Sequence, residues 1–211
     1  MKLNRDVIAR TALGLLNEVG LDGLTMRLLA KELGVQVAAL YWHLKNKQEL
    51  LDAMAAIMFH ELNDSLEGPR KGADWTDWIA ERVRSMRQMM LSYRDGARVF
   101  AGTYVSESEL PRSIELTLST MVDAGFSVRD AARGFPALYH YVIGFTIEEQ
   151  ARTGTAYTDD NPYETDELAF DTERFPLAAE AAPHLFDSRS DRGFEEGLQV
   201  ILAGLQAHYL R

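Results

Sequence analysis

The sequence predicts an all-α protein with a small helix-turn-helix head at its N-terminus and a larger helical body. Three observations support this fold class. Apolar residues recur at helical spacing in most segments, and no run alternates as strands do. Residues 25–47 contain two short helical segments that meet at Gly34. Residues 127–152 and 190–209 carry long apolar stripes, which require burial against other helices.

The head is predicted to contain three helices. The first covers residues 4–19, and Asn4 is its N-cap because its side chain can accept a hydrogen bond from a free backbone N–H group. Thr25 caps the second helix, and Gly34 ends it because this turn needs a residue that tolerates a positive φ. The third helix covers about residues 36–43. The turn between the first two helices is bracketed by Gly20 and Gly23.

The body is predicted to open with a central, buried helix. Asn46 and Glu49 have the spacing of a capping box, with Asn46 as N-cap and Glu49 at the third helical position. Apolar residues surround much of the segment that follows. The Gly- and Pro-containing loop at residues 65–74 is the best candidate boundary by composition. The division that we adopt is a helix-turn-helix domain at 1–46 and a larger helical domain at 47–211.

Five further helices are expected along the body. They are a helix capped by Asp74, a short one around 97–101, one around 116–122 closed by Gly125, a long one over 127–152 and a final one over 190–209. Pro136 should kink the long helix or reset its start, because proline lacks the N–H group that a helix interior uses. Residues 153–176 are rich in Thr, Asp and Glu, which predicts an acidic surface segment with at most one short helix.

The chain has 211 residues and a net charge of −10, which by itself argues against nucleic-acid binding. The charge is unevenly distributed: residues 1–50 contain seven Lys or Arg and five Asp or Glu, so that the remaining residues carry −12. A slightly basic head on an acidic body can meet DNA with the head alone. The absence of cysteine excludes disulfides, thiolate metal sites and cysteine nucleophiles. We expect a cytoplasmic protein, because neither a signal-peptide core nor a membrane-length apolar run is present.

The helices over 127–152 and 190–209 are too apolar for helices that stand alone on a surface. Paired, they would expose a stripe that suits a second copy of the same pair, which predicts a homodimer through a four-helix interface. The two-fold symmetry would match the way in which helix-turn-helix heads read two half-sites about one DNA turn apart. The alternative is that these helices only fill the core of one monomer.

The order of these elements resembles the TetR family of ligand-responsive repressors, and several motifs resemble its tetracycline-repressor branch. The resemblance covers the chain to about residue 150. The motifs that carry it are Leu3-Asn-Arg, Ala12-Leu13, Leu15-Leu16-Asn17-Glu18, Gly20-Leu-Asp-Gly-Leu-Thr25, Leu40-Tyr-Trp-His-Leu-Lys-Asn-Lys47, Leu51-Asp-Ala53, Tyr93-Arg-Asp-Gly-Ala97, Gly102-Thr103, Gly125-Phe-Ser127 and Arg129-Asp130.

The resemblance implies that the head binds a palindromic double-stranded DNA operator. Arg27 would read a base, guanine by its two-pronged guanidinium. Val37, Ala38 and Ala39 replace the branch's Gln-Pro-Thr triplet, so amide readout of adenine is lost and the operator differs. The DNA-binding residues implied are Thr25, Met26, Arg27, Gln36, Val37, Ala38, Ala39, Tyr41, Trp42, His43 and Lys47. The alternatives are packing within the head for Tyr41 and Trp42, and a surface charge for Arg27.

The resemblance also implies a cavity in the body and an effector that releases the DNA. In the tetracycline branch the effector is a magnesium chelate, and a histidine, a threonine and a glutamate meet the metal. Here Phe100 stands at the histidine position, and a phenyl ring cannot ligate a hard cation. Thr103 and Glu148 remain at the other two positions. We therefore expect no metal site and no cofactor, and a small-molecule effector other than magnesium-tetracycline.

Other pocket positions also depart from the branch. Asn63 and Arg82 replace the residues that hold the polar edge of tetracycline, and Met86 replaces a phenylalanine. His140 stands where the branch has a pocket histidine, although His140 and Glu148 could instead be polar residues of a core or an interface. The ligand-binding residues implied are Asn63, Arg82, Met86, Phe100, Thr103, Tyr104, Leu116, Thr117, Leu138, His140 and Glu148.

The sequence allows three alternatives to this function. One is a tetracycline-type antibiotic repressor with an altered metal site. Another is a ligand-blind helix-turn-helix regulator, which would keep the head but fill the cavity. An enzyme is disfavoured, because the sequence has no Gly-rich phosphate loop, nucleophile elbow or His/carboxylate cluster with metal spacing. We expect no catalytic residues and no membrane partner.

Overall fold

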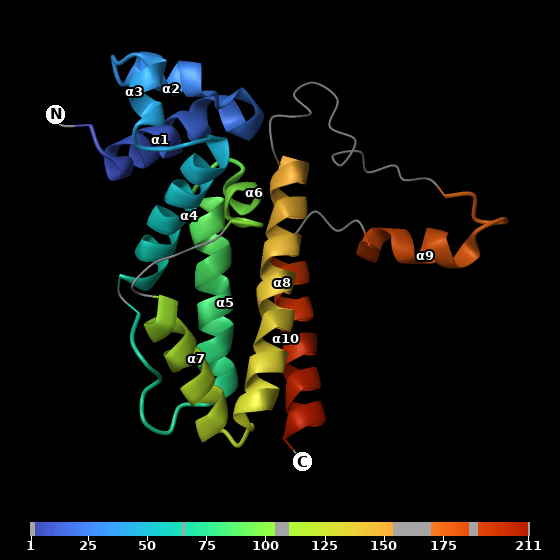
Figure 1. Ribbon diagram of the computed structural model, residues 1–211. Coiled ribbons are helices and arrows are strands. Elements are labelled where there is room, and N and C mark those ends of the chain that lie inside the picture. The colour runs from blue at the N-terminus through green and yellow to red at the C-terminus, as the bar shows by residue number, and fades with distance from the viewer. Residues whose placement is uncertain (1–2, 65, 104–109, 154–169, 186–189, 211) are drawn as a thin grey trace.

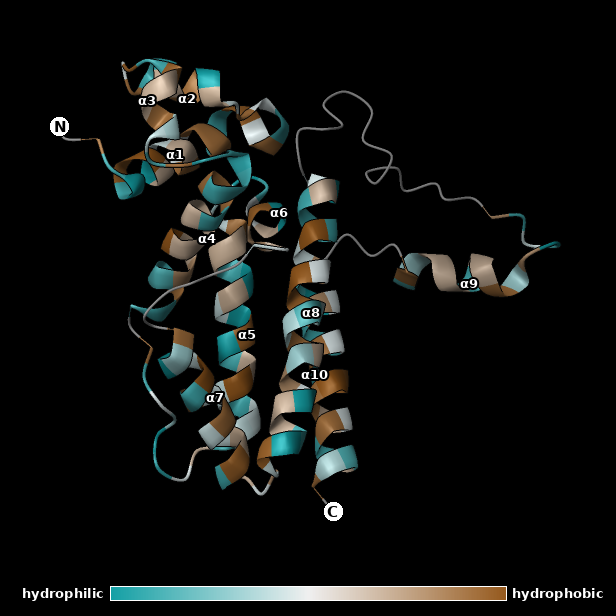
Figure 2. Ribbon diagram, in the orientation of Figure 1, coloured by the Kyte–Doolittle hydropathy of each residue, from teal (hydrophilic) through white to brown (hydrophobic). Residues whose placement is uncertain are grey.

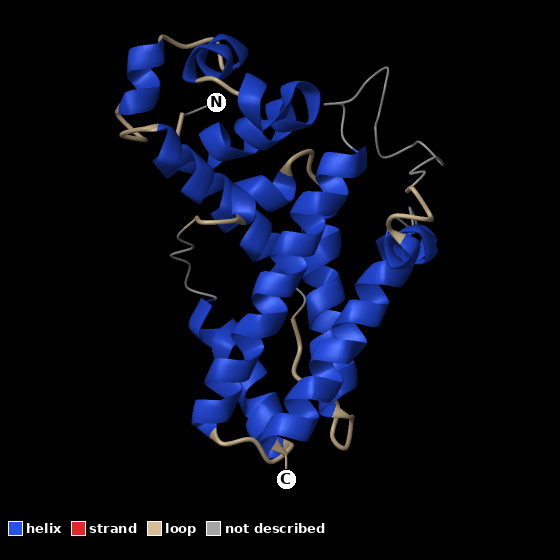
Figure 3. Ribbon diagram, turned by 90° about the vertical axis from the view of Figure 1, so that its right-hand side faces the viewer, coloured by secondary structure: helices blue, strands red, loops and turns tan. Residues whose placement is uncertain are grey.

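The computed structural model describes residues 3–64, 66–103, 110–153, 170–185 and 190–210, and its regular elements there are all α-helices, as Figure 3 shows. The prediction of an all-α fold is confirmed. The helices are α1 (Arg5–Gly23), α2 (Met26–Glu32), α3 (Val37–Tyr41), α4 (Lys47–Asn63), α5 (Trp75–Leu91), α6 (Gly96–Phe100), α7 (Leu110–Asp123), α8 (Val128–Thr153), α9 (Pro176–Leu185) and α10 (Ser190–Tyr209).

The head consists of α1, α2 and α3, and the starts of α1 and α2 are those that the capping residues predict. The Asn4 side chain accepts a hydrogen bond from the Val7 N–H at 2.8 Å, and the Thr25 hydroxyl accepts one from the Leu28 N–H at 3.1 Å. Gly34 has a φ of +65° at the turn between α2 and α3. These bonds satisfy donors that a helix start otherwise leaves free.

Helix α4 joins the head to the body. It packs against α1 on one side and against α5 and α6 on the other, as the arrangement in Figure 1 shows. The Asn46 side chain caps it by accepting a hydrogen bond from the Glu49 N–H at 2.9 Å. The Glu49 carboxylate accepts from the Lys45 N–H at 2.9 Å, one residue before the position that a standard capping box uses. Leu50, Met54 and Met58 are fully buried, in agreement with a central helix.

The body is a bundle of long helices. Helix α8 contacts α5, α6, α7 and α10, and Figure 1 shows α8 and α10 side by side along their length. Figure 2 shows apolar residues interleaved with polar ones along these helices. The face of α10 that packs inward is apolar, and its buried side chains are Phe194, Leu198, Leu202 and Leu205.

Two expectations for the body need correction. Helix α8 continues from Val128 to Thr153 with Pro136 in its interior, so proline does not reset its start. The carbonyl that loses its donor belongs to Ala132, an exposed residue, and water can satisfy it there. Helix α9 was not predicted, although it begins with a proline, which suits a first helical position, and four of its ten residues are alanine. The acidic stretch predicted at 153–176 falls largely at 154–169, outside the described residues.

Candidate DNA-binding surface and effector cavity

Two large aromatic side chains of the head face solvent. Trp42 is 86 % exposed and Tyr41 is 49 % exposed, at the C-terminal end of α3. A core role would bury both rings, as Leu40 and Leu44 on either side of them are buried. Because the buried leucines pack against the rest of the head, the two aromatic rings lie on its outer surface.

The other residues implied for DNA binding lie on α2 and α3, in the residues that flank these helices, and at the start of α4. Arg27, Gln36, Ala38 and His43 are exposed, whereas Met26, Val37 and Ala39 are half-buried. Thr25 is exposed, and its hydroxyl is engaged as the cap of α2. The exposed Lys47 donates a hydrogen bond from Nζ to the carbonyl of Leu21 at 3.3 Å, so its ammonium is directed at the end of α1 in this structure.

The body contains a cavity of about 120 Å³ between α4, α5, α6, α7 and α8. Its wall is mainly apolar, with few polar groups, as in most small-molecule sites. Four of the predicted ligand-binding residues line it: Arg82, Met86, Phe100 and Thr117. The lining residues that the sequence reasoning missed are Phe59, Leu62, Leu110, Ser113, Ile114, Leu118, Phe135 and Tyr139.

The missed residues of α7 follow a helical pattern that could have revealed them. Leu110, Ser113, Thr117 and their neighbours recur every three or four positions, so they lie on one face of α7. That face is less apolar than an ordinary core face, because it includes Ser113 and Thr117, which are buried. A buried face that carries hydroxyl groups is a signal for a cavity wall.

Arg82 is the charged residue of the cavity wall. It is 6 % exposed, and burial lowers the pKa of its guanidinium to about 10, so it remains a cation at neutral pH. The guanidinium donates to the Leu62 carbonyl at 3.2 Å, the Asn63 side-chain oxygen at 2.6 Å and the Ser113 hydroxyl at 3.0 Å. Asn63 is in turn fixed by donating to the Phe59 carbonyl at 2.6 Å.

The remaining predicted ligand-binding residues do not line the cavity. Asn63 supports Arg82 from behind, Leu138 is buried in α8, and Leu116 is half-buried on α7. His140 and Glu148 are exposed in this single chain. Thr103 is half-buried and donates from its hydroxyl to the Phe100 carbonyl at 2.8 Å, and Tyr104 lies outside the described residues.

The described residues of the cavity wall do not fit a magnesium ion. Magnesium takes oxygen ligands, especially carboxylates, and none of the described lining residues is an Asp or Glu. Phe100 offers a phenyl ring, and the nearby Arg82 cation would repel a second positive charge. Within the described part of the chain, no group of three or more His, Asp or Glu side chains is placed to hold a metal.

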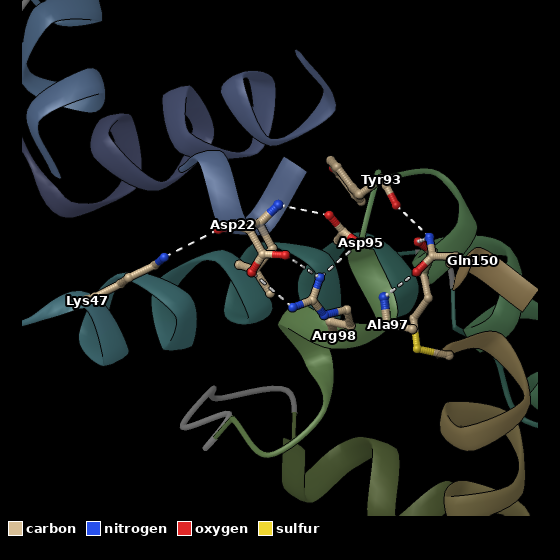
Figure 4. A network of polar contacts seen from close by, with 9 residues as sticks. Asp22, Lys47, Tyr93, Asp95, Ala97, Arg98 and Gln150 are labelled. Carbon is tan, nitrogen blue, oxygen red and sulfur yellow. Dashed lines mark hydrogen bonds and ion pairs between the residues drawn. The ribbon is translucent and has the colours of Figure 1, made fainter. Parts of the chain in front are cut away.

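Helix α6 connects the cavity to the head. Phe100 lines the cavity, and Arg98 on the same helix forms an ion pair with Asp22 at the end of α1, at 3.2 Å (Figure 4). This hydrogen-bonded partner lowers the pKa of Asp22. Asp95 accepts a hydrogen bond from the Leu21 N–H at 2.8 Å. Helix α6 thus contacts both the cavity and the end of α1.

Gln150 of α8 holds the other side of α6. Its side-chain oxygen accepts from the Ala97 N–H at 3.0 Å, and its side-chain nitrogen donates to the Tyr93 carbonyl at 2.8 Å (Figure 4). Asp95 itself has a left-handed backbone with a φ of 56°. The short helix is thus fixed between the head and α8 by specific polar contacts.

The head and the body each match a known protein family. Residues 8–54 match "Bacterial regulatory proteins, tetR family", and residues 68–209 match "Tetracyclin repressor-like, C-terminal domain". Among curated proteins, the class A tetracycline repressor from transposon 1721 of Escherichia coli is 40 % identical over 204 residues, which cover 97 % of this chain and 91 % of that protein.

Solved structures show the same fold. A possible TetR family transcriptional regulator from Streptomyces coelicolor A3(2) has a TM-score of 0.84 at 37 % identity, covering 97 % of this chain and 99 % of the other. ActR from Streptomyces coelicolor in complex with actinorhodin has a TM-score of 0.82 at 32 % identity, covering 98 % and 97 %. None of the described helices combines the length and apolar character needed to cross a bilayer.

The sequence match extends over both the head and the body, and the relatives are transcriptional regulators. Repressors of this kind bind operator DNA and a small-molecule effector as dimers. The earlier resemblance is therefore confirmed at the level of family, fold and general function. The chain belongs to the TetR family of ligand-responsive transcriptional repressors.

Proposed function

We propose that this chain is a cytoplasmic repressor, without catalytic activity, whose effector is an organic molecule other than magnesium-tetracycline. The head at residues 1–46 would bind the operator, and residues 47–211 would form the ligand-binding and dimerisation domain. The observation that carries the proposal is the position of α6, which contributes Phe100 to the cavity and Arg98 to the contact with Asp22 of the head.

The DNA half of the proposal is supported by the exposed aromatic residues Trp42 and Tyr41 and by the exposed Arg27. In a helix-turn-helix dimer the two heads meet half-sites about one helical turn apart. Selection from a randomised double-stranded DNA library with the purified protein should therefore recover an inverted repeat of that spacing. Recovery of DNA without two-fold symmetry would contradict a symmetric reader.

The effector half is tested by release from the selected operator. Tetracycline with magnesium should leave the operator complex intact at micromolar concentration, because Phe100 replaces the metal-binding histidine and Arg82 brings a positive charge to the cavity. Fluorescence anisotropy of labelled operator measures the release. If the unmodified protein dissociates under these conditions, the effector assignment is wrong, whereas a magnesium response that appears only in Phe100→His supports it.

A ligand-blind regulator is the second candidate, and the cavity disfavours it. A regulator that responds to no effector could have a body whose interior is completely filled by its own side chains. The space of about 120 Å³ beside α6 instead leaves room for a guest, and ActR has been solved with actinorhodin bound. A native mass spectrum of the protein purified from its own host should show a bound small molecule.

A further inference from the structure

The three arginines of α5, which are Arg82, Arg84 and Arg87, differ in the partners that their guanidinium groups have. Arg87 is 5 % exposed and pairs with Glu149 at 2.8 Å and with Asp191 at 2.8 Å, and its guanidinium lies 4.7 Å from the centre of the Phe194 ring. Arg84 forms two hydrogen bonds with Glu195, at 2.6 and 2.8 Å. Carboxylates thus neutralise both of these cations.

Arg82, which is as deeply buried as Arg87, has neutral partners. Its acceptors are a backbone carbonyl, the Asn63 amide and the Ser113 hydroxyl, and within the described part of the chain no carboxylate forms an ion pair with it. Burial of a cation without a counter-charge is strongly unfavourable, and proteins usually avoid it. The uncompensated charge at the cavity wall therefore requires an explanation.

The guanidinium also has donors to spare. It carries five N–H groups, and the bonds to Leu62, Asn63 and Ser113 use three of them. The two others make no hydrogen bond to the described residues, and Arg82 lines the cavity. The bonds to Asn63 and Ser113 also hold the guanidinium in place, so that it is oriented before a ligand arrives.

The rest of the cavity wall restricts the size and the polarity of a ligand. It is formed largely by aliphatic and aromatic side chains such as Met86, Phe100 and Phe135, with Tyr139 as an additional polar group. The volume of about 120 Å³ is close to that of an engineered cavity of about 150 Å³ that accommodates benzene. A molecule with one aromatic ring is the size that this wall can enclose.

We propose that the effector of this chain is an aromatic carboxylic acid, whose carboxylate binds Arg82 inside the cavity while its ring packs between Met86 and Phe100. The inference rests on the proposed function, since it identifies the chemical class of the effector. Charge-assisted hydrogen bonds between arginine and a carboxylate are about twice as strong as neutral ones, and removal from water strengthens them. The ligand would supply the negative charge that the cavity wall lacks.

The test compares acids with neutral molecules of the same shape. Benzoate, salicylate and cinnamate are paired with benzamide, salicylamide and cinnamamide, and calorimetry and thermal shift measure binding to the full-length protein. We expect each acid to bind at least about tenfold more tightly than its amide, as a hydrogen bond to a charged group predicts. Equal binding of acids and amides, or no binding of any acid, overturns the proposal.

Variants assign the preference to Arg82. Arg82→Gln keeps donors for Asn63 and Ser113 but removes the charge, so the acid should lose its advantage over the amide. Arg82→Lys keeps the charge and should retain part of the preference. Arg70→Gln, a change at an exposed arginine outside the cavity, is the matched control and should bind as the unmodified protein does. An undiminished acid preference in Arg82→Gln overturns the assignment.

Operator binding, measured on the same samples, separates this inference from the proposed function. If a neutral amide releases the protein from the operator as effectively as the matching acid does, the protein is still a ligand-responsive repressor and only the acid assignment is wrong. If the protein binds no operator at all, the proposed function itself fails, whatever the binding of acids shows.

Discussion

At the scale of single residues, exposure distinguishes a binding residue from a packing residue. Leu40 lies in α3 and Trp42 is the C-cap of the same helix, yet Trp42 is 86 % exposed and Leu40 is fully buried. The exposed ring contributes little to the folded state of the free protein, because it has no apolar surroundings. We therefore expect Trp42 to act on a partner and Leu40 to act on stability.

Trp42→Ala should weaken operator binding about 5- to 30-fold while leaving the free energy of unfolding within about 0.5 kcal/mol. Leu40→Ala should instead lower that free energy by about 2–5 kcal/mol, because it leaves a cavity in the head. Anisotropy with labelled operator and thermal unfolding measure the two quantities. A large loss of stability in Trp42→Ala would show that the ring packs within the head.

The capping residues show which residue-scale features the sequence can predict. Asn4, Thr25 and Asn46 were identified from their spacing to the following helix, and each side chain accepts the expected backbone hydrogen bond. A cap depends on residues three positions away, so a short window of sequence contains the information. The partner of Arg82 depends on the packing of distant helices, and no local pattern in the sequence reveals it.

At the scale of elements, the contact between α1 and the Tyr93–Ala97 turn depends on Gly20. This residue has a φ of +69°, and an added Cβ atom would lie 3.0 Å from the side chains of Arg94 and Asp95. Both the backbone conformation and the available space therefore favour glycine at this position. The resulting turn lets α1 end against α6.

Gly20→Ala should lower the free energy of unfolding by about 1–3 kcal/mol, through a strained backbone and the crowding of Arg94 and Asp95. Gly14→Ala is the matched control in the same helix: an added Cβ atom there has no neighbour within 4 Å. It should raise the free energy of unfolding by about 0.5–1 kcal/mol, since alanine favours helix. Urea unfolding measures both, and equal effects would contradict the structural role of Gly20.

The ion pair between Arg98 and Asp22 should couple the body to the head more than it stabilises either. Both side chains are exposed, and exposed ion pairs contribute little to stability because water and salt screen them. We expect Arg98→Gln to reduce the ratio of operator dissociation constants measured with and without effector, with little change in melting temperature. The control is Asp6→Asn, which breaks an exposed pair with Arg10 inside the head. A coupling ratio that stays constant in Arg98→Gln would exclude this contact from signal transmission.

At the scale of the whole molecule, the outer surface of α10 indicates where the second copy packs. Val200 is 72 % exposed on α10, and Val128 is 63 % exposed at the start of α8. Figure 1 shows that these two helices run side by side, which agrees with an interface made from 127–152 and 190–209. Two such pairs would form a four-helix interface about a two-fold axis.

Val200→Glu should shift the protein from dimer to monomer, because it would bury a carboxylate at an apolar interface. The monomer should bind a palindromic operator much more weakly, since one head would contact one half-site. Val122→Glu, at a less exposed apolar position of α7, is the control and should remain dimeric. Sedimentation velocity measures the oligomeric state, and a dimeric Val200→Glu would place the interface elsewhere.

The sequence by itself was sufficient for the helix starts, for the helix-turn-helix head and for the family. These features depend on local hydrogen bonds, on apolar periodicity and on motifs such as Leu40-Tyr-Trp-His-Leu-Lys-Asn-Lys47, all of which are contained in continuous segments.

Only the tertiary structure decided which residues face the cavity and whether their charges are paired. Five helices from α4 to α8 contribute to its wall, and His140 and Glu148, expected there, lie exposed on α8 instead. The structure also shows how Arg82 differs from Arg84 and Arg87. Arg84 and Arg87 each bind a carboxylate, whereas Arg82 binds the Asn63 amide, and nothing in the local sequence indicates this difference. Side-chain pairing across a bundle depends on how distant helices rotate and pack, and that information is absent from any single segment of the chain.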